Sequence, residues 1–154
     1  TRTEPTYKFF EHYIQALPEW DRLLVIDTNW DTIQEDLLCD LIEQDVNLIH
    51  SSDGGAAGCN GSYGSLAASH PYPDELEGQV LIEVGGRAFG DDSGSFRAEG
   101  YGKLAIVRLI YHVIIYYKLK PACSFRFLCD NQGLLTCIEK GLSRPYVTPR
   151  HFLI

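Results

Sequence analysis

The sequence predicts an α/β fold: a mixed sheet of three antiparallel strands, followed by helix, strand and helix, behind a helical N-terminal extension. Three β-prone segments, separated by turn residues, follow one another between positions 46 and 88, which is typical of an antiparallel meander. A long apolar helical pattern then precedes a fourth β-prone segment. A right-handed crossover through that helix places the fourth strand parallel to the first.

Length and composition indicate one globular domain with a short extension. The chain has 154 residues, of which 45% are apolar and 22% charged, so it can bury a sizeable core. The longest apolar stretch, 104–119, is interrupted by charged residues and is too short for a membrane span. The polar start shows no signal peptide, and the lack of any Met predicts a segment of a longer protein.

The net charge of −8 lies entirely in the first third of the chain. Residues 1–47 contain eleven acidic and three basic side chains, whereas residues 48–154 contain ten of each. Acidity argues against phosphate binding by the leading segment but leaves the rest open to nucleic acid. The five cysteines have no zinc-site spacing, and their odd number predicts reduced thiols in an intracellular protein.

The leading segment, 1–47, is predicted to be an acidic helical extension. One apolar set at helical spacing begins at Phe9 and ends before Pro18. A second runs from Ile33 to Ile42, with Asp31 and Gln34 as a capping pair. Two interpretations stay open, because the extension either packs on the following domain or docks onto another part of a longer protein.

The following domain, 48–154, begins with the strands. The first covers 46–49 and leads into a Gly-rich segment, and the second covers 62–69 after an Asn60-Gly61 hairpin turn. The third covers 79–88 and alternates apolar and polar positions, with Leu81 on the polar face.

A helix from 96 to 119, capped by Ser95, leads to a strand at 123–129. A second helix follows at about 132–141, and a last strand barely begins at 152–154.

Three acidic residues occupy the positions where this topology converges. Asp53 follows the first strand, Asp130 follows the fourth, and Glu99 lies in the first turns of the long helix. Parallel neighbouring strands would bring Asp53 and Asp130 to one end of the sheet, where the crossover helix aims Glu99. Converging carboxylates repel one another unless a divalent cation is bound, and hard oxygen ligands suit Mg²⁺ or Mn²⁺. Two such ions about 3.5–4 Å apart support phosphodiester hydrolysis.

Three segments resemble the signatures of the ribonuclease H-like domain of retroelement reverse transcriptases. They are 52–56 (SDGGA), 95–102 (SFRAEGYG) and 127–135 (FLCDNQGLL), and the resemblance covers about two thirds of the chain. It implies a nuclease that cuts the RNA strand of RNA–DNA hybrids with two Mg²⁺ or Mn²⁺ ions, in a polyprotein with a neighbouring polymerase region.

The resemblance also implies roles for individual residues. Asp53, Glu99 and Asp130 match the catalytic metal ligands. Gly54 and Gly55 match positions where the backbone approaches nucleic acid, and Asn131 takes a substrate-side position more often held by serine.

The sequence departs from the family in ways that keep an alternative open. No acidic residue follows Glu139, so the family's fourth acid is missing, and the final strand and helix are incomplete. The alternative is a catalytically inactive ribonuclease H-like scaffold or interaction module. A transposase or integrase is disfavoured, because in those enzymes the glutamate lies on a late helix rather than between the two aspartates. His112 is expected to be a packed or edge residue on the apolar helix.

Overall fold

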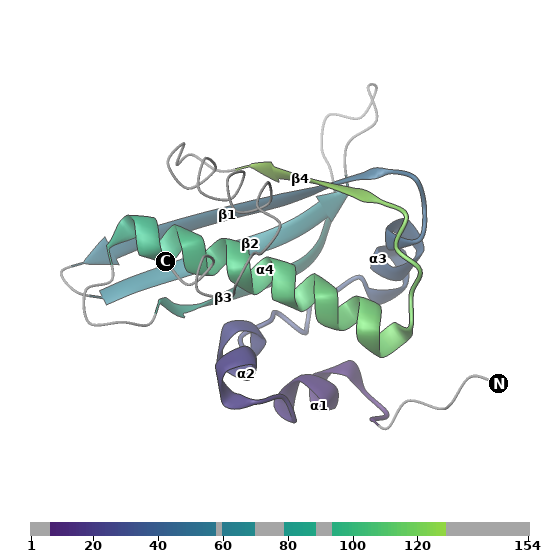
Figure 1. Cartoon of the computed structure of the whole chain (residues 1–154), viewed down its shortest axis with the longest axis horizontal. Coiled ribbons are helices and arrows are strands. Elements are labelled where there is room, and N and C mark those ends of the chain that lie inside the picture. Colours follow the sequence, from purple (N-terminus) through teal and green to yellow (C-terminus); the bar gives the residue numbers. More distant parts are fainter. Residues whose placement is uncertain (1–6, 58–59, 70–78, 89–93, 129–154) are drawn as a thin grey trace, which may run out of the picture.

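The computed structural model describes residues 7–57, 60–69, 79–88 and 94–128. They form a four-stranded sheet in the order β3-β2-β1-β4, with the long helix α4 lying along one face (Figure 1). Strands β1, Asn47–Ala57, β2, Asn60–Ser69, and β3, Val80–Ala88, are antiparallel neighbours. Strand β4, Ser124–Leu128, pairs with β1 in parallel. The predicted mixed sheet is therefore confirmed.

The pairing of β1 with β2 corrects two predicted boundaries. The first strand continues through the Gly-rich segment to Ala57, because residues 51–57 all find partners on β2. Asn60 pairs with Ala57 and Gly61 with Ala56, so the predicted Asn-Gly turn is wrong and both residues belong to β2. Two residues, 58 and 59, separate the strands, and they lie outside the described part of the chain.

Helix α4, Ser95–Tyr117, packs an apolar face of small and branched side chains onto the sheet. Its residue Gly102 fits against the sheet so closely that a Cβ there would lie 3.0 Å from the Oγ of Ser65. The Ser65 hydroxyl donates a 2.6 Å hydrogen bond to the Gly102 carbonyl. The close packing explains why a helix-weakening glycine is tolerated. The predicted cap at Ser95 is wrong, because the N-cap residue is Gly94, which has no side chain to cap the helix, and Ser95 is the first helical residue.

The N-terminal extension contains three short helices rather than the two predicted. Helix α1 covers Phe10–Gln15, α2 covers Glu19–Val25 and α3 covers Glu35–Ile42. The predicted Asp31 cap is wrong, because Gln34 is the N-cap residue of α3 and makes no side-chain cap hydrogen bond. The three helices pack beside the C-terminal half of α4 and the β3 edge of the sheet (Figure 1).

The segment between α2 and α3 covers the edge strand β3. The Asn29 N–H donates to the Glu83 carbonyl, and the Gln34 N–H donates to the Leu81 carbonyl, both at 2.9 Å. Thr28 and Val84 form an isolated antiparallel bridge. The prediction that Leu81 lies on the polar face is wrong, because its side chain is fully buried in the hydrophobic core. An exposed sheet edge invites aggregation, and here the chain's own segment protects it.

The predicted helix at 132–141 and the strand beginning at 152 lie outside the described residues. Among the described helices, none is long and apolar enough to cross a membrane. Cys39 and Cys123 are free thiols.

Candidate functional site

Strand β1 and the first turns of α4 meet backbone to backbone at Gly54. A Cβ at this position would lie 2.5 Å from the backbone nitrogen of Glu99 and 2.6 Å from the carbonyl carbon of Ala98. Non-bonded heavy atoms essentially never lie within 3.0 Å of a Cβ atom, so only glycine fits at position 54. The structure thus brings two of the predicted site segments, Asp53-Gly54 and Glu99, together across sheet and helix.

The Asp53 side chain is exposed beside this contact. Side chains alternate along a strand, and Gly54 faces α4, so the Asp53 side chain leaves from the other face of the sheet. Its Oδ1 accepts a 2.9 Å hydrogen bond from the Gly54 N–H. This hydrogen bond ties the carboxylate to the backbone N–H of the next residue.

Glu99 is half-buried, and one of its oxygens needs a partner. Its Oε2 is inaccessible to solvent and has no hydrogen-bond partner among the described residues. A buried carboxylate oxygen without a donor or a cation is unfavourable by roughly 1–3 kcal/mol or more. A donor or cation near Glu99 would remove that cost.

Two buried basic side chains, Lys103 on α4 and His50 on β1, lie in the interior next to this part of the fold. Lys103 is one helical turn after Glu99 on α4 and only 4% exposed. Its ammonium donates a 3.5 Å hydrogen bond to the His50 carbonyl and lies 5.2 Å from the Phe127 ring centroid on β4. Sequence reasoning missed both residues. The i, i+4 spacing from Glu99 is the signal that could have found Lys103.

His50 is buried in neutral form, which predicts a pH-dependent stability. Burial, followed by the charge of Lys103, lowers the pKa of His50 to about 3. The unfolded chain therefore binds a proton at His50 below about pH 6.5 that the folded chain rejects, so folding stability falls as the pH falls. This group alone should make the protein about 2 kcal/mol less stable at pH 5 than at pH 7.

We expect His50→Leu to remove that part of the pH dependence. Neither ring nitrogen of His50 has a hydrogen-bond partner among the described residues. Replacement by leucine therefore removes no hydrogen bond that is observed among those residues. Urea unfolding at pH 7 and pH 5 measures the difference, with the exposed His12→Gln as control. Equal pH dependence in His50→Leu and the unsubstituted protein would contradict the prediction.

The remaining predicted site residues divide into two groups. Gly55 is exposed, and a Cβ there would meet no atom within 4 Å, so sterics do not require glycine. Asp130 and Asn131 lie outside the described residues. The last described β1–β4 pair is Ser51 with Leu128, two positions before Asp53 and Asp130 in the sequence.

The described residues contain no group of three or more His, Cys, Asp or Glu side chains that could hold a metal ion. The two described candidates nevertheless fit the chemistry of a divalent cation. Glu99 offers a buried oxygen without a hydrogen-bond partner among the described residues, and Asp53, next to Gly54 in β1, offers an exposed carboxylate. Such hard oxygen ligands suit Mg²⁺ or Mn²⁺.

A second polar cluster joins the extension to α4. The buried Asp21 carboxylate accepts hydrogen bonds from Arg108 Nε at 3.0 Å and Nη2 at 2.7 Å, and its Oδ2 lies 2.7 Å from His112 Nε2. Tyr13 Oη lies 3.0 Å from His112 Nδ1. His112 is indeed packed on α4, as predicted, but within this network rather than among apolar side chains alone.

The pKa shifts in this cluster favour one protonation state. Burial alone would raise the pKa of Asp21, but hydrogen bonds from Arg108 and the His112 contact outweigh it and lower the pKa. Burial lowers the pKa of His112, and Asp21 only partly opposes that change. A neutral imidazole with hydrogen on Nε2 therefore donates to Asp21 and accepts from the Tyr13 hydroxyl. The hydrogen bonds of Tyr13 and Asp21 with Arg108 and His112 thus hold α1 and α2 to α4.

The comparisons with known proteins add no relative. No protein-family model, curated protein or solved structure matches this chain.

Proposed function

We propose that the chain is the ribonuclease H-like module of a retroelement reverse transcriptase polyprotein. It is a metal-dependent endonuclease that cuts the RNA strand of RNA–DNA hybrids. Its intracellular setting and the neighbouring polymerase region of the parent polyprotein are part of the proposal. The single observation that supports it best is the backbone contact of Gly54 with Glu99, which brings the residue next to Asp53 against a half-buried glutamate.

The sheet topology supports the proposal independently of that contact. β4 runs parallel to β1 and next to it, as the predicted convergence of Asp53 and Asp130 requires. Glu99 is on the helix that connects β3 with β4. We propose Asp53, Glu99 and Asp130 as the ligands of two Mg²⁺ or Mn²⁺ ions, with Gly54, Gly55 and Asn131 on the substrate side.

The chain's own residues have distinct tasks in this proposal. Glu99 presents a carboxylate oxygen that lacks a protein donor among the described residues, so it is available to a cation. Gly54 admits close approach of strand and helix and thereby fixes the separation of Asp53 from Glu99. When bound, divalent ions activate water and stabilise the oxygen that leaves the phosphodiester. The RNA 2′-hydroxyl is the group that distinguishes the strands.

The test is cleavage of an RNA–DNA hybrid labelled on the RNA strand, in Mn²⁺. We expect Asp53→Asn and Asp130→Asn each to reduce cleavage by at least about 100-fold, because each removes a charged metal ligand. Calorimetric titration with Mn²⁺ provides a second readout, in which heat of binding should be lost in Asp53→Asn. Asp27→Asn, exposed at the end of the extension's second helix, is the charge-matched control.

The alternative is a catalytically inactive scaffold of the same fold. It is favoured by the low basic charge of the chain. A folded protein that neither cleaves the hybrid nor binds Mn²⁺ would contradict the nuclease proposal and support the scaffold. Cleavage that is unchanged in Asp53→Asn would contradict the proposed ligand set.

A further inference from the structure

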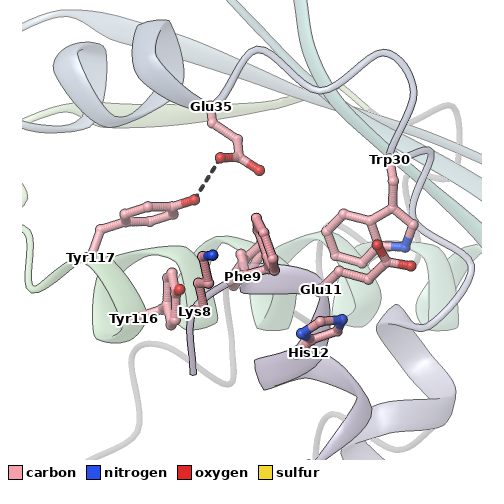
Figure 2. Close-up of a pocket in the computed structure, with 9 residues that line it drawn as sticks. Lys8, Phe9, Glu11, His12, Trp30, Glu35, Tyr116 and Tyr117 are labelled. Carbon is pink, nitrogen blue, oxygen red and sulfur yellow. Dashed lines mark hydrogen bonds between the residues drawn. The ribbon is translucent and has the colours of Figure 1, made fainter. Parts of the chain in front are cut away.

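A pocket lies between the N-terminal extension and the C-terminal end of α4. None of its lining residues belongs to the proposed nuclease site. It has a volume of about 530 Å³, within the range of small-molecule sites. Residues 8–12, Trp30, Glu35 and the last turn of α4 line it (Figure 2). Nothing in the nuclease proposal uses this pocket.

Aromatic side chains form much of the pocket wall, together with Lys8, Glu11, His12 and Glu35. Phe10 is buried, and its ring centroid lies 5.7 Å from that of Trp30, 5.4 Å from Tyr116 and 5.9 Å from Tyr117. Trp30 and Tyr117 lie on opposite sides of the space, with the Glu35 side chain extending between them (Figure 2). Aromatic faces around a cavity are the surface that binds ammonium groups, because the ring quadrupole attracts a cation.

A fixed carboxylate supplies negative charge to the same pocket. Glu35 Oε2 accepts a 2.8 Å hydrogen bond from the Tyr117 hydroxyl. Burial, and then the hydrogen bond to Glu35, raise the pKa of Tyr117, so the hydroxyl keeps its proton and the bond persists. The chain already places an ammonium on an aromatic face here, because Lys8 Nζ lies 5.4 Å from the Phe9 ring centroid at the rim.

We propose that this pocket binds an organic cation, an alkylammonium group held against Trp30, Tyr116 and Tyr117 with Glu35 as its counter-charge. The acidic extension favours the approach of such a ligand, since residues 1–47 carry a net charge of −8. The same negative charge disfavours an anion, and an uncharged ligand would leave the charge of Glu35 without a counter-ion from the ligand.

The test is a fluorescence titration of the full chain in the Trp20→Phe background, where Trp30 is the remaining tryptophan. Choline is the probe, and 3,3-dimethylbutan-1-ol is its uncharged control of the same shape. We expect saturable quenching by choline, with affinity at least about 5-fold higher than for the alcohol. Nα-acetyl-trimethyllysine methylamide, as a third probe, distinguishes a lysine side chain from a free ammonium as the source of the group.

Three variants make the proposal falsifiable. Glu35→Gln keeps an acceptor for Tyr117 and should weaken choline about 5-fold while leaving the alcohol unchanged. Asp36→Asn, its exposed neighbour outside the pocket, should change neither. Lys8→Gln should tighten choline about 2-fold, because it removes a competing cation. Equal affinity for choline and the alcohol, weaker choline binding in Lys8→Gln, or no saturable binding to the folded protein would each overturn the proposal.

Discussion

Replacing Gly54 by alanine is expected to destabilise the protein by about 3 kcal/mol, because the added methyl group must displace helix backbone rather than a side chain. The Cβ would lie 2.5 Å from the Glu99 nitrogen and 2.9 Å from the Glu99 Cα. A flexible side chain could rotate away from such a contact, but the first turns of α4 cannot move without breaking their packing on β1 and β2.

Gly55→Ala is the matched control for this substitution. It makes the same chemical change one position later in the same strand, where a Cβ meets nothing within 4 Å. We expect its free energy of unfolding to change by less than about 1 kcal/mol. Urea unfolding of both variants gives the comparison, and a Gly54→Ala protein as stable as Gly55→Ala would show that strand and helix are not held in contact.

The same pair of variants also bears on the proposed site. If Asp53 and Glu99 bind metal together, Gly54→Ala must weaken Mn²⁺ binding even though no ligand is altered, because the strand and helix are forced apart. Gly55→Ala should bind Mn²⁺ as the unsubstituted protein does. A scaffold without a metal site would show the loss of stability alone.

The sequence was sufficient to predict the mixed sheet because its strands and connecting helix are marked by local patterns. Alternation and turn residues identify β2 and β3, and the crossover rule places β4 beside β1. The contact of Gly54 with Glu99 follows from the same topology, since parallel β1 and β4 require α4 to cross the sheet. The approach of the two segments that contain the described candidate acids was therefore predictable, whereas the exit of the Asp53 side chain from the other face of the sheet was not.

The features that sequence reasoning missed depend on contacts between distant segments. Asp21 reads as a solvated helix residue, but its partner Arg108 is 87 positions away. Leu81 occupies a polar register of β3 but is fully buried in the core, beside the edge along which the extension pairs. Similarly, Asn60 and Gly61 were predicted to form a turn, but both residues pair with β1 as part of β2. Local sequence patterns do not show which distant residues will be in contact.

Replacing Asp21 by alanine is expected to cost about 3–5 kcal/mol of folding free energy, the largest effect we predict for a single side chain. The substitution leaves the Arg108 guanidinium without its bidentate partner, and His112 Nε2 without its acceptor, at a buried junction between α2 and α4. Trp20 and Tyr111 stack on the same guanidinium, so their contacts loosen as well.

Glu19→Ala is the control, because it removes an equal charge from an exposed position on the same short helix. Urea unfolding should separate the two variants by at least about 2 kcal/mol. Trp20 fluorescence should change in Asp21→Ala under native conditions. If the variants differ by less than that, the extension is held by its apolar contacts and not by this network.

Acid should reproduce the effect of Asp21→Ala, and the sign of the pKa shift explains why. The pKa of Asp21 is lowered in the folded protein, so its stabilising contribution is present above the ordinary carboxyl range near pH 4 and lost as the pH falls through the lowered value. The lowered pKa of His112 acts in the same direction from about pH 6.5 downward. Asp21→Ala should consequently lose less stability than the unsubstituted protein on acidification below pH 4. A double-mutant cycle with Arg108→Met adds a measurement independent of pH, because two partners in one network must give a combined loss smaller than the sum of the single losses.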